Sequence, residues 1–404
     1  MKKILLILLI VGLIGVISYL IWNQNINKRE EENNISDIEE NLEEEENIET
    51  RTIFPVAVGY EVKILDLKSN TLSSIPGNPE AEVVFGESVD GKWLIISEGK
   101  REVAPGPSPD FFLSGWNLYR VNKETGEKLP IVLDKNVIVA VRSPKEDLIA
   151  YVTHTHGLWL VNLDGENKRQ VVPDNNVIAG NILWMKRTGE PFIFWSSDGK
   201  KISFSTFPKD YKGGDMWETQ GVGLYLLEEN EFKILGEDVY NVFNVWGWYD
   251  NENILVKIAQ PFIYDPEKSE VLRSEGTGFY LLNIEGNLDF FGPGYSGSIH
   301  DILIKNKIVY VLIPDQKRKS NNPLDPDFEI SWQNLQIVIY SNIKEWDEPK
   351  TLVENLTDGF YARFTLDGRI IYENRDGRLV IINLDGSNPI VLPEDIKLPI
   401  YFAP

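Results

Sequence analysis

The stretch that decides the fold is Ser196–Gly236. It reads SSDGKKISFSTF from Ser196 and, after a polar connection, GVGLYLLEENEFKILG from Gly221. An Asp-Gly pair precedes an apolar strand, a second strand follows, and a tight turn leads into a short third strand. The same order recurs along most of the chain, with unit starts about 55 residues apart, as in repeat architectures. The sequence therefore predicts an array of structural repeats.

Each unit can be written as four strands, A to D. Asp-Gly or a similar pair joins strands A and B, because tight hairpin turns need a positive φ. These turns are Asp90-Gly91, Lys145-Glu146-Asp147, Asp198-Gly199, Asp250-Asn251, Asn306-Lys307 and Asp367-Gly368. The B strands begin at Trp93, Leu148, Ile202, Ile254, Ile308 and Ile370, and the C strands at Asn117, Leu158, Gly223, Gly278, Gln336 and Arg378. Short β-branched and aromatic strands with this repeat length predict an all-β propeller of four-stranded blades.

The two ends of the chain supply one further unit. Ile53–Val58, Val62–Leu67 and Thr71–Ile75 are predicted as strands B, C and D without a preceding strand A. Leu398–Phe402 is predicted as a strand A with no strand B after it. A ring closed by this C-terminal strand would leave no free sheet edge. We therefore expect seven blades. Six blades is the alternative, if the weak unit around 304–313 is not a blade.

Composition restricts the classes of function. Of the 404 residues, 42% are hydrophobic, which is enough to bury a large core. The 62 acidic and 40 basic side chains give a formal charge of −22, and such a surface repels phosphate backbones, so nucleic acid is not an expected partner. The chain has no cysteine, which excludes disulfides and a thiol nucleophile. No set of residues amounts to a reaction mechanism, and no cofactor is expected.

The N-terminus predicts a membrane anchor. Lys2 and Lys3 precede an apolar run, Ile4–Trp22, whose length of about 19 residues is close to that of a membrane-spanning helix. No Ala-x-Ala cleavage site follows it. We expect residues 1–22 to be an uncleaved signal anchor with a cytoplasmic N-terminus and the rest of the chain outside the cell membrane. Secretion after cleavage is the alternative. Residues 23–51, rich in Glu and Asn, should form a disordered acidic linker before the propeller domain, 52–404.

The repeat motif resembles a known family. The run W-S-S-D-G-K-K-I-S-F at Trp195–Phe204, followed by G-L-Y-L-L, resembles the WD40-like (PD40) repeats of TolB-like β-propellers. The resemblance covers roughly residue 53 to the end, and it implies the fold rather than a function, because these positions build turns and core. Relatives of this kind serve as interaction platforms, as lyase-type enzymes or as lids of peptidases. The chain has no G-x-S-x-G elbow, so the resemblance does not imply a peptidase.

Long connections mark one face of the predicted propeller. Hairpin order places the A–B and C–D turns on one rim and the B–C and D–A connections on the other. Five connections on the second rim are long: 98–116, 173–191, 207–222, 260–277 and 314–333. Long connections cost ordering entropy and are often functional where a protein tolerates them. Their aromatic residues either bind a partner or pin the loops to the propeller. The candidate binding residues on this long-loop face are Phe112, Trp116, Trp184, Tyr211, Trp217, Tyr264, Phe328 and Trp332.

No metal site is predicted. His154 and His156 could share one side of an extended segment, but a metal site needs three or four converging ligands. Asp325, Asp327 and Glu329 lack the spacing of a calcium loop. The sequence thus favours a membrane-anchored, extracytoplasmic, non-catalytic binding or scaffold module for an envelope protein, peptide or glycan. The alternative is a propeller enzyme, a polysaccharide lyase or hydrolase, with its site at the channel mouth of the long-loop face.

Overall fold

A computed structural model divides the chain into two units, Met1–Arg51 and Thr52–Pro404. The structure describes residues 53–58, 60–99, 102–103, 112–178, 193–206, 221–235, 242–258, 263–265, 270–272, 278–293, 301–316, 335–340, 350–356, 362–365, 368–394 and 396. The predicted anchor (1–22), linker (23–51) and closing strand Leu398–Phe402 lie outside these residues. Within the described ranges, no helix is long and apolar enough to cross a membrane.

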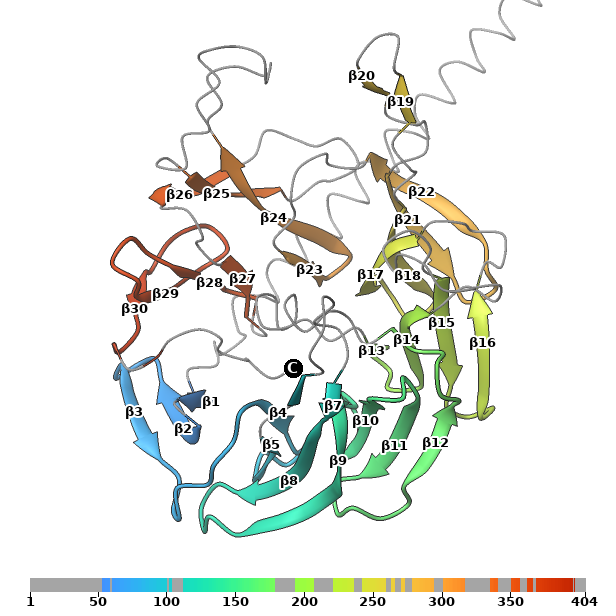
Figure 1. Cartoon of the computed structure of the whole chain (residues 1–404). Coiled ribbons are helices and arrows are strands. Elements are labelled where there is room, and N and C mark those ends of the chain that lie inside the picture. The colour runs from blue at the N-terminus through green and yellow to red at the C-terminus, as the bar shows by residue number, and fades with distance from the viewer. Residues whose placement is uncertain are drawn as a thin grey trace, which may run out of the picture. The chain divides into compact units, whose positions relative to one another are not determined.

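The regular elements of the described residues are all strands, and the neighbouring strands of each sheet pair antiparallel (Figure 1). The first sheet has the order β1-β2-β3, and its register pairs Ile53 with Asp66. Its strands are β1 (Ile53–Val58), β2 (Glu61–Asp66) and β3 (Thr71–Ser74). They match the B, C and D strands that the sequence predicts for the N-terminal unit.

The next two repeats share one strand. Their seven-stranded sheet has the order β12-β11-β10-β9-β8-β5-β4, in which β9 is the last strand of one four-stranded group and the first of the next. In the sequence, the polar residues Asp134, Lys135 and Asn136 interrupt the apolar pattern of β9, so the sequence does not show that the strand continues. In the structure Lys135 has a φ of 50°. The strands are β4 (Val84–Glu87), β5 (Trp93–Glu98), β8 (Trp116–Asn122), β9 (Lys128–Arg142), β10 (Leu148–Thr153), β11 (Leu158–Asn162) and β12 (Arg169–Val172).

The remaining repeats form four-stranded sheets. Their orders are β13-β14-β15-β16, β17-β18-β21-β22, β23-β24-β25-β26 and β27-β28-β29-β30. The strands are β13 (Ile193–Trp195), β14 (Lys201–Thr206), β15 (Gly221–Leu226), β16 (Glu231–Leu235), β17 (Val242–Trp248), β18 (Asn253–Ile258), β21 (Gly278–Asn283), β22 (Leu288–Pro293), β23 (Asp301–Lys305), β24 (Ile308–Gln316), β25 (Leu335–Tyr340), β26 (Lys350–Leu356), β27 (Ala362–Phe364), β28 (Ile370–Glu373), β29 (Leu379–Ile382) and β30 (Ile390–Val391). Four-stranded antiparallel sheets of this kind are consistent with propeller blades, as the repeats predict.

The turn from Ser196 to Lys201 shows why the same residue types recur in the repeats. The hydroxyl of buried Ser196 lies 2.5 Å from Asp198 Oδ1 and accepts a hydrogen bond from the backbone N–H of Lys201 at 3.0 Å. Asp198 Oδ1 also accepts from the N–H of Lys200, and Gly199 has a φ of 73°, which favours glycine. In the β23–β24 turn, Asn306 and Lys307 adopt positive φ instead, at 49° and 61°. The motif is therefore a turn whose polar atoms are satisfied locally.

Hydrophobic clusters join each sheet to the next one along the chain. Within the described residues, one cluster brings together β2, β4, β5 and β8, and others follow in order along the chain up to one that joins β24 and β25 to β28 and β29. A further cluster packs Phe54, Val56 and Leu65 of the first sheet against Ile371 and Ile381 of the last. The succession of cores therefore returns to its starting point.

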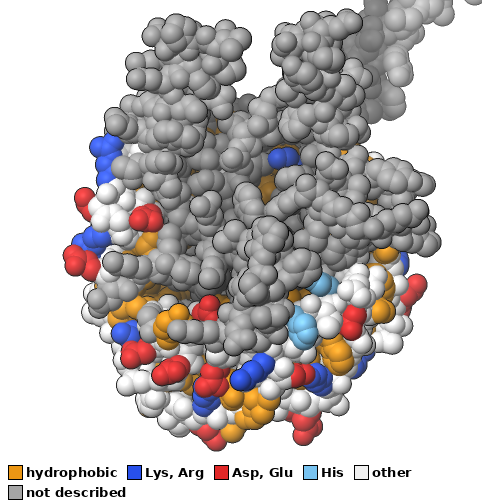
Figure 2. All heavy atoms as spheres, viewed as in Figure 1, with side chains coloured by type: hydrophobic (Ala, Val, Ile, Leu, Met, Phe, Trp, Pro, Cys, Tyr) orange, Lys and Arg blue, Asp and Glu red, His pale blue; other side chains and the backbone are white. Residues whose placement is uncertain are grey.

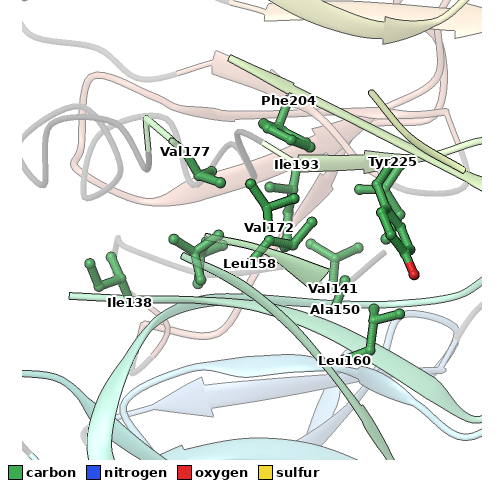
Figure 3. Close-up of a cluster of buried hydrophobic side chains, with 13 residues drawn as sticks. Ile138, Val141, Ala150, Leu158, Leu160, Val172, Val177, Ile193, Phe204 and Tyr225 are labelled. Atoms are coloured by element: carbon green, nitrogen blue, oxygen red, sulfur yellow. The ribbon is translucent and has the colours of Figure 1, made fainter. Parts of the chain in front are cut away.

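Figure 3 shows one such core, between the β9–β12 group and the β13–β16 sheet. Val141 and Leu160 approach it from one side, and Ile193 and Phe204 approach it from the other. Alternate residues of each strand point to the same side, so every second apolar residue of a strand can enter one core. Complete burial of one such aliphatic or aromatic side chain stabilises the fold by about 1.5–3 kcal/mol.

Indole side chains add hydrogen bonds between neighbouring sheets. Trp195 Nε1 donates to the backbone carbonyl of Val141 at 3.1 Å, and Trp248 Nε1 donates to that of Phe194 at 2.9 Å. Both tryptophans occupy the same position of the repeat, at the end of a first strand. The innermost strands are thereby tied to one another as well as packed.

Candidate functional site

Two of the long connections, 173–191 and 207–222, begin at neighbouring points of the frame. The N–H of Ile178, in the connection after β12, donates to the carbonyl of Ser205 at the end of β14, 2.8 Å away. The N–H of Ser97, at the end of β5, donates in the same way to the carbonyl of Val83 before β4, 2.9 Å away. These bonds join a D–A connection to a B–C connection, as the hairpin order requires of a shared rim. The named ends of the connections are therefore held to the frame by backbone hydrogen bonds.

Two of the long connections contain short hairpins of their own. In one of them β6 (Glu102–Val103) pairs with β7 (Phe112–Ser114), and in the other β19 (Ile263–Asp265) pairs with β20 (Glu270–Leu272). Each hairpin is a separate two-stranded sheet outside the four-stranded frame. Figure 1 shows the β19–β20 hairpin apart from the four-stranded sheets. The frame does not need these hairpins for its strand order.

The connection between β10 and β11 is short and carries two histidines. His156 Nδ1 lies 3.0 Å from the carbonyl of Val177, and the hydroxyl of Thr155 donates to Asp174 Oδ1 at 2.8 Å. Burial lowers the pKa of His156 below its ordinary value, although the hydrogen bond with Val177 opposes this shift. His154 is exposed, and Figure 2 shows histidine side chains at the surface of the face viewed. His156 therefore has a structural role in pinning this connection.

The described residues contain no group of three or more His, Asp or Glu side chains placed to hold a metal ion. On the described part of the face in Figure 2, acidic and basic side chains are interspersed with apolar ones. The segment of Asp325, Asp327 and Glu329 lies outside the described residues.

Trp116 is the predicted binding residue whose side chain the structure describes. Trp116 is only 1% exposed, its Nε1 donates to Glu82 Oε2 at 2.7 Å, and its ring meets that of Phe85 edge to face. Its indole packs into the core at the end of the connection instead of onto the long-loop face. Of the two roles considered for these aromatic residues, Trp116 therefore has that of pinning a loop to the propeller. The sequence could not separate the two roles, because both favour a tryptophan at a loop end.

For Phe112 and Tyr264 the structure describes only the backbone, in β7 and β19. The other five candidates lie outside the described residues, and their role stays a prediction. They are Trp184, Tyr211, Trp217, Phe328 and Trp332.

Sequence reasoning did not single out a second concave region, on the rim of the short turns. A pocket of 390 Å³ lies where the β4–β5, β9–β10 and β11–β12 turns meet. Its lining includes Asp90, Glu146, Asp147 and Asp164, together with the guanidinium of Arg120. Asp-Gly turns supply Asp90 and Asp164, and the turn Lys145-Glu146-Asp147 supplies the other two carboxylates. The sequence gives all four only a turn-forming role.

Comparisons with known proteins support the fold. No protein-family model matches the sequence, and no curated protein is similar to it. Dipeptidyl peptidase 4 of Porphyromonas gingivalis is similar in structure, with a TM-score of 0.51 and 11% identity over 85% of this chain and 52% of that protein. For the tricorn protease these values are 0.48 and 13%, over 86% and 34%. For TolB of Acinetobacter baumannii they are 0.42 and 14%, over 86% and 79%.

At these identities the similarity shows a fold and no activity. The fold is the β-propeller that the repeats predict, and the structural neighbours include TolB. The chain spans about a third of the length of the tricorn protease and about half that of the dipeptidyl peptidase. What those proteases act on is therefore no guide to this chain.

Proposed function

We propose that the protein is a non-catalytic binding module that captures an envelope protein, peptide or glycan through its long-loop face. One observation carries the proposal: connections on this rim carry extra hairpins, β6–β7 and β19–β20, that the sheet frame does not use. Ordering such segments costs entropy, which binding can offset. The aromatic residues of these connections, including Phe112 and Tyr264, would supply the contact area.

The proposal includes a seven-bladed ring. The β4–β12 sheet contains two four-stranded groups that share β9. If these groups are counted separately, the sheets of the described residues correspond to seven units, the first with three strands, which supports this number. Leu398–Phe402 is proposed as the strand that completes the first unit and closes the ring. The cluster that packs Phe54 against Ile381 supports closure between these two units.

The proposal also includes an anchor. The apolar run within residues 1–22 would hold the propeller at the outer side of the cell membrane, and the acidic linker of residues 23–51 would give it reach. The support for this part is the hydropathy and charge pattern of the sequence alone.

Affinity capture tests the binding function. The full-length chain, solubilised in detergent, is offered to envelope extract and to isolated cell-wall material beside the variant Trp217→Ala/Trp332→Ala. We expect the wild type to retain a specific protein or glycan that the folded variant loses. The matched control is Phe290→Ala, which removes an exposed aromatic side chain of β22 outside the long connections and should leave capture unchanged.

Equal retention by the wild type and by Trp217→Ala/Trp332→Ala would contradict a role for the long-loop face. Retention of nothing would contradict the binding module itself. The propeller enzyme would then be the hypothesis to test, by screening polysaccharide and peptide substrates.

A further inference from the structure

The beginning of one long connection is fastened to a short connection. Residues 174–178 follow β12 and belong to the connection 173–191 of the long-loop face. The N–H groups of Asn176 and Val177 both donate to the carbonyl oxygen of His156, at 3.2 and 2.9 Å. His156 lies in the β10–β11 connection, and its φ of 60° is in the left-handed region. His156 is therefore a point of attachment for the segment 174–178.

The imidazole of His156 adds a side-chain bond to the same segment. Its Nδ1 lies 3.0 Å from the carbonyl oxygen of Val177. A carbonyl oxygen can only accept, so Nδ1 carries the hydrogen and Nε2 is the nitrogen that takes up a proton in acid. The side chain of Val177 is fully buried in the core shown in Figure 3. The ring therefore lies where the segment enters the core.

The titratable groups next to this ring, among the described residues, are His154 on the same connection and Asp174 in the segment. The Asp174 carboxylate is turned to other partners, since its Oδ1 accepts from the hydroxyl of Thr155 at 2.8 Å and from a side-chain amide of β12 at 2.7 Å. Asn136 of β9 and the last two residues of β14, which also bond to these two connections, do not titrate. The described charge that acts on His156 is that of His154, which opposes protonation of the ring.

Burial makes the charged form of His156 costly. It lowers the pKa of His156 below the ordinary 6.5, and repulsion from His154 adds to this shift, whereas the hydrogen bond with Val177 opposes it. If the segment opens, water reaches the ring and the pKa returns toward its ordinary value. The open state therefore binds the proton more tightly than the closed state. The balance shifts toward the open state as the pH falls below 6.5, and it is independent of this proton above that value.

We propose that His156 is an acid-sensitive latch. Its neutral imidazole fastens residues 174–178 to the β10–β11 connection, and protonation of Nε2 shifts the segment toward an open state. Since the segment belongs to a connection of the long-loop face, acid would change that face where the connection leaves the frame. The latch does not depend on the binding function proposed above, and the measurement that tests it involves no partner.

Hydrogen exchange of the full-length chain in detergent tests the latch. Mass spectrometry follows the amides of residues 174–178 at pH 7.5 and pH 5, with the intrinsic exchange rate at each pH divided out. We expect the protection of the segment to fall by about threefold or more in acid, with an upper limit of about 30-fold if only the open state binds the proton. The reference is the segment 79–83, where the N–H of Ala81 donates to the carbonyl of Tyr60 in a connection without histidine. Protection of the reference segment should not change.

Variants assign the effect to one side chain. His156→Asn should keep the segment protected at both pH values, because the amide Nδ2 can replace the imidazole Nδ1 as donor to Val177 and does not titrate. Asparagine also tolerates the positive φ of this position. The matched control is His154→Asn, which removes the exposed histidine two positions away and should retain the fall in protection.

Four results would overturn the proposal. They are unchanged protection of residues 174–178 in acid, the same fall in His156→Asn as in the wild type, the same fall in the reference segment, and loss of the effect in His154→Asn. The last result would assign the titration to His154 instead of His156.

Discussion

The side-chain amide of Asn70 donates a hydrogen bond to the backbone carbonyl of Val391, 2.9 Å away, although 321 positions separate the two residues in the sequence. Asn70 lies between β2 and β3, and Val391 is in β30, so this bond joins the first sheet to the last. The bond is exposed, and a typical hydrogen bond contributes only about 0.5–1.5 kcal/mol net. The buried cluster that packs Phe54 against Ile381 should therefore contribute more to this junction.

Truncation of Ile381 should destabilise the propeller strongly. Ile381 is 1% exposed and belongs to the cluster between the first and last sheets, so Ile381→Ala should lower the free energy of unfolding by about 2–5 kcal/mol. Urea unfolding of the full-length chain measures the loss. Leu133→Ala is the control, because Leu133 is 57% exposed and its truncation should change stability by less than about 0.5 kcal/mol. Equal losses in both variants would contradict a structural junction here.

The contribution of the Trp248 indole hydrogen bond to the free energy of unfolding should be measurable. Trp248→Phe removes the donor to the carbonyl of Phe194 and should cost about 1–3 kcal/mol, because a partly buried acceptor loses its partner. Trp159→Phe is the matched control, since Trp159 Nε1 is buried without an acceptor among the described residues. The control should lose less stability. A larger loss for Trp159→Phe would show that ring volume, and not the hydrogen bond, decides the outcome.

The repeat turns should make stability depend on acid pH. Burial raises the pKa of Asp198, but hydrogen bonds from Ser196, Lys200 and Lys201 outweigh it and hold the pKa below the ordinary 3.8. A carboxylate whose pKa is depressed in the folded state stabilises that state above the ordinary value, and this stability is lost as the pH falls through the lower, folded pKa. The difference in unfolding free energy between wild type and Asp198→Asn should therefore shrink as the pH falls below 3.8.

Urea titrations of both proteins from pH 6 to pH 2.5 measure this difference. Ser196→Ala removes the hydroxyl next to the carboxylate and should reduce the same pH dependence. A constant difference across the range would show that Asp198 contributes through its shape alone.

Removal of the Tyr151 hydroxyl should not harm stability. Tyr151 is fully buried, and its hydroxyl oxygen has no hydrogen-bond partner among the described residues. Tyr151→Phe should therefore be neutral or raise the unfolding free energy by about 1 kcal/mol. Burial also raises the pKa of Tyr151, so the wild type should lose stability as the pH rises above about 10, and the variant should lose less. Thermal unfolding at pH 7 and pH 10.5 checks both points, and a loss above 2 kcal/mol at pH 7 would contradict the first.

The β19–β20 hairpin should be dispensable for folding. Replacement of 263–272 by a flexible Gly-Ser segment should leave the melting temperature unchanged, because the hairpin forms a sheet of its own. If the long-loop face binds the partner proposed above, the same replacement should weaken capture. A large fall in melting temperature would show instead that the hairpin is part of the frame.

The sequence by itself determined the order and position of the strands. The Asp-Gly turns and the apolar strands that follow them, such as ISFST from Ile202, are local signals, because a tight turn and an alternating strand depend on neighbouring residues. Each B strand that the repeats predict is present, from Trp93 in β5 to Ile370 in β28. The β-propeller fold follows from this periodicity.

Only the tertiary structure decided the rest. Trp116 has the sequence signature of a surface anchor, yet Glu82 and Phe85 hold its indole in the core, and both contacts join residues about 30 positions apart. The pocket on the rim of the short turns depends on a similar separation, since its lining combines Arg120 of one repeat unit with Glu146 and Asp164 of the next. The local sequence pattern does not predict such pairs. The packing of whole sheets sets the distance between the two residues, whereas the turns that carry them do not.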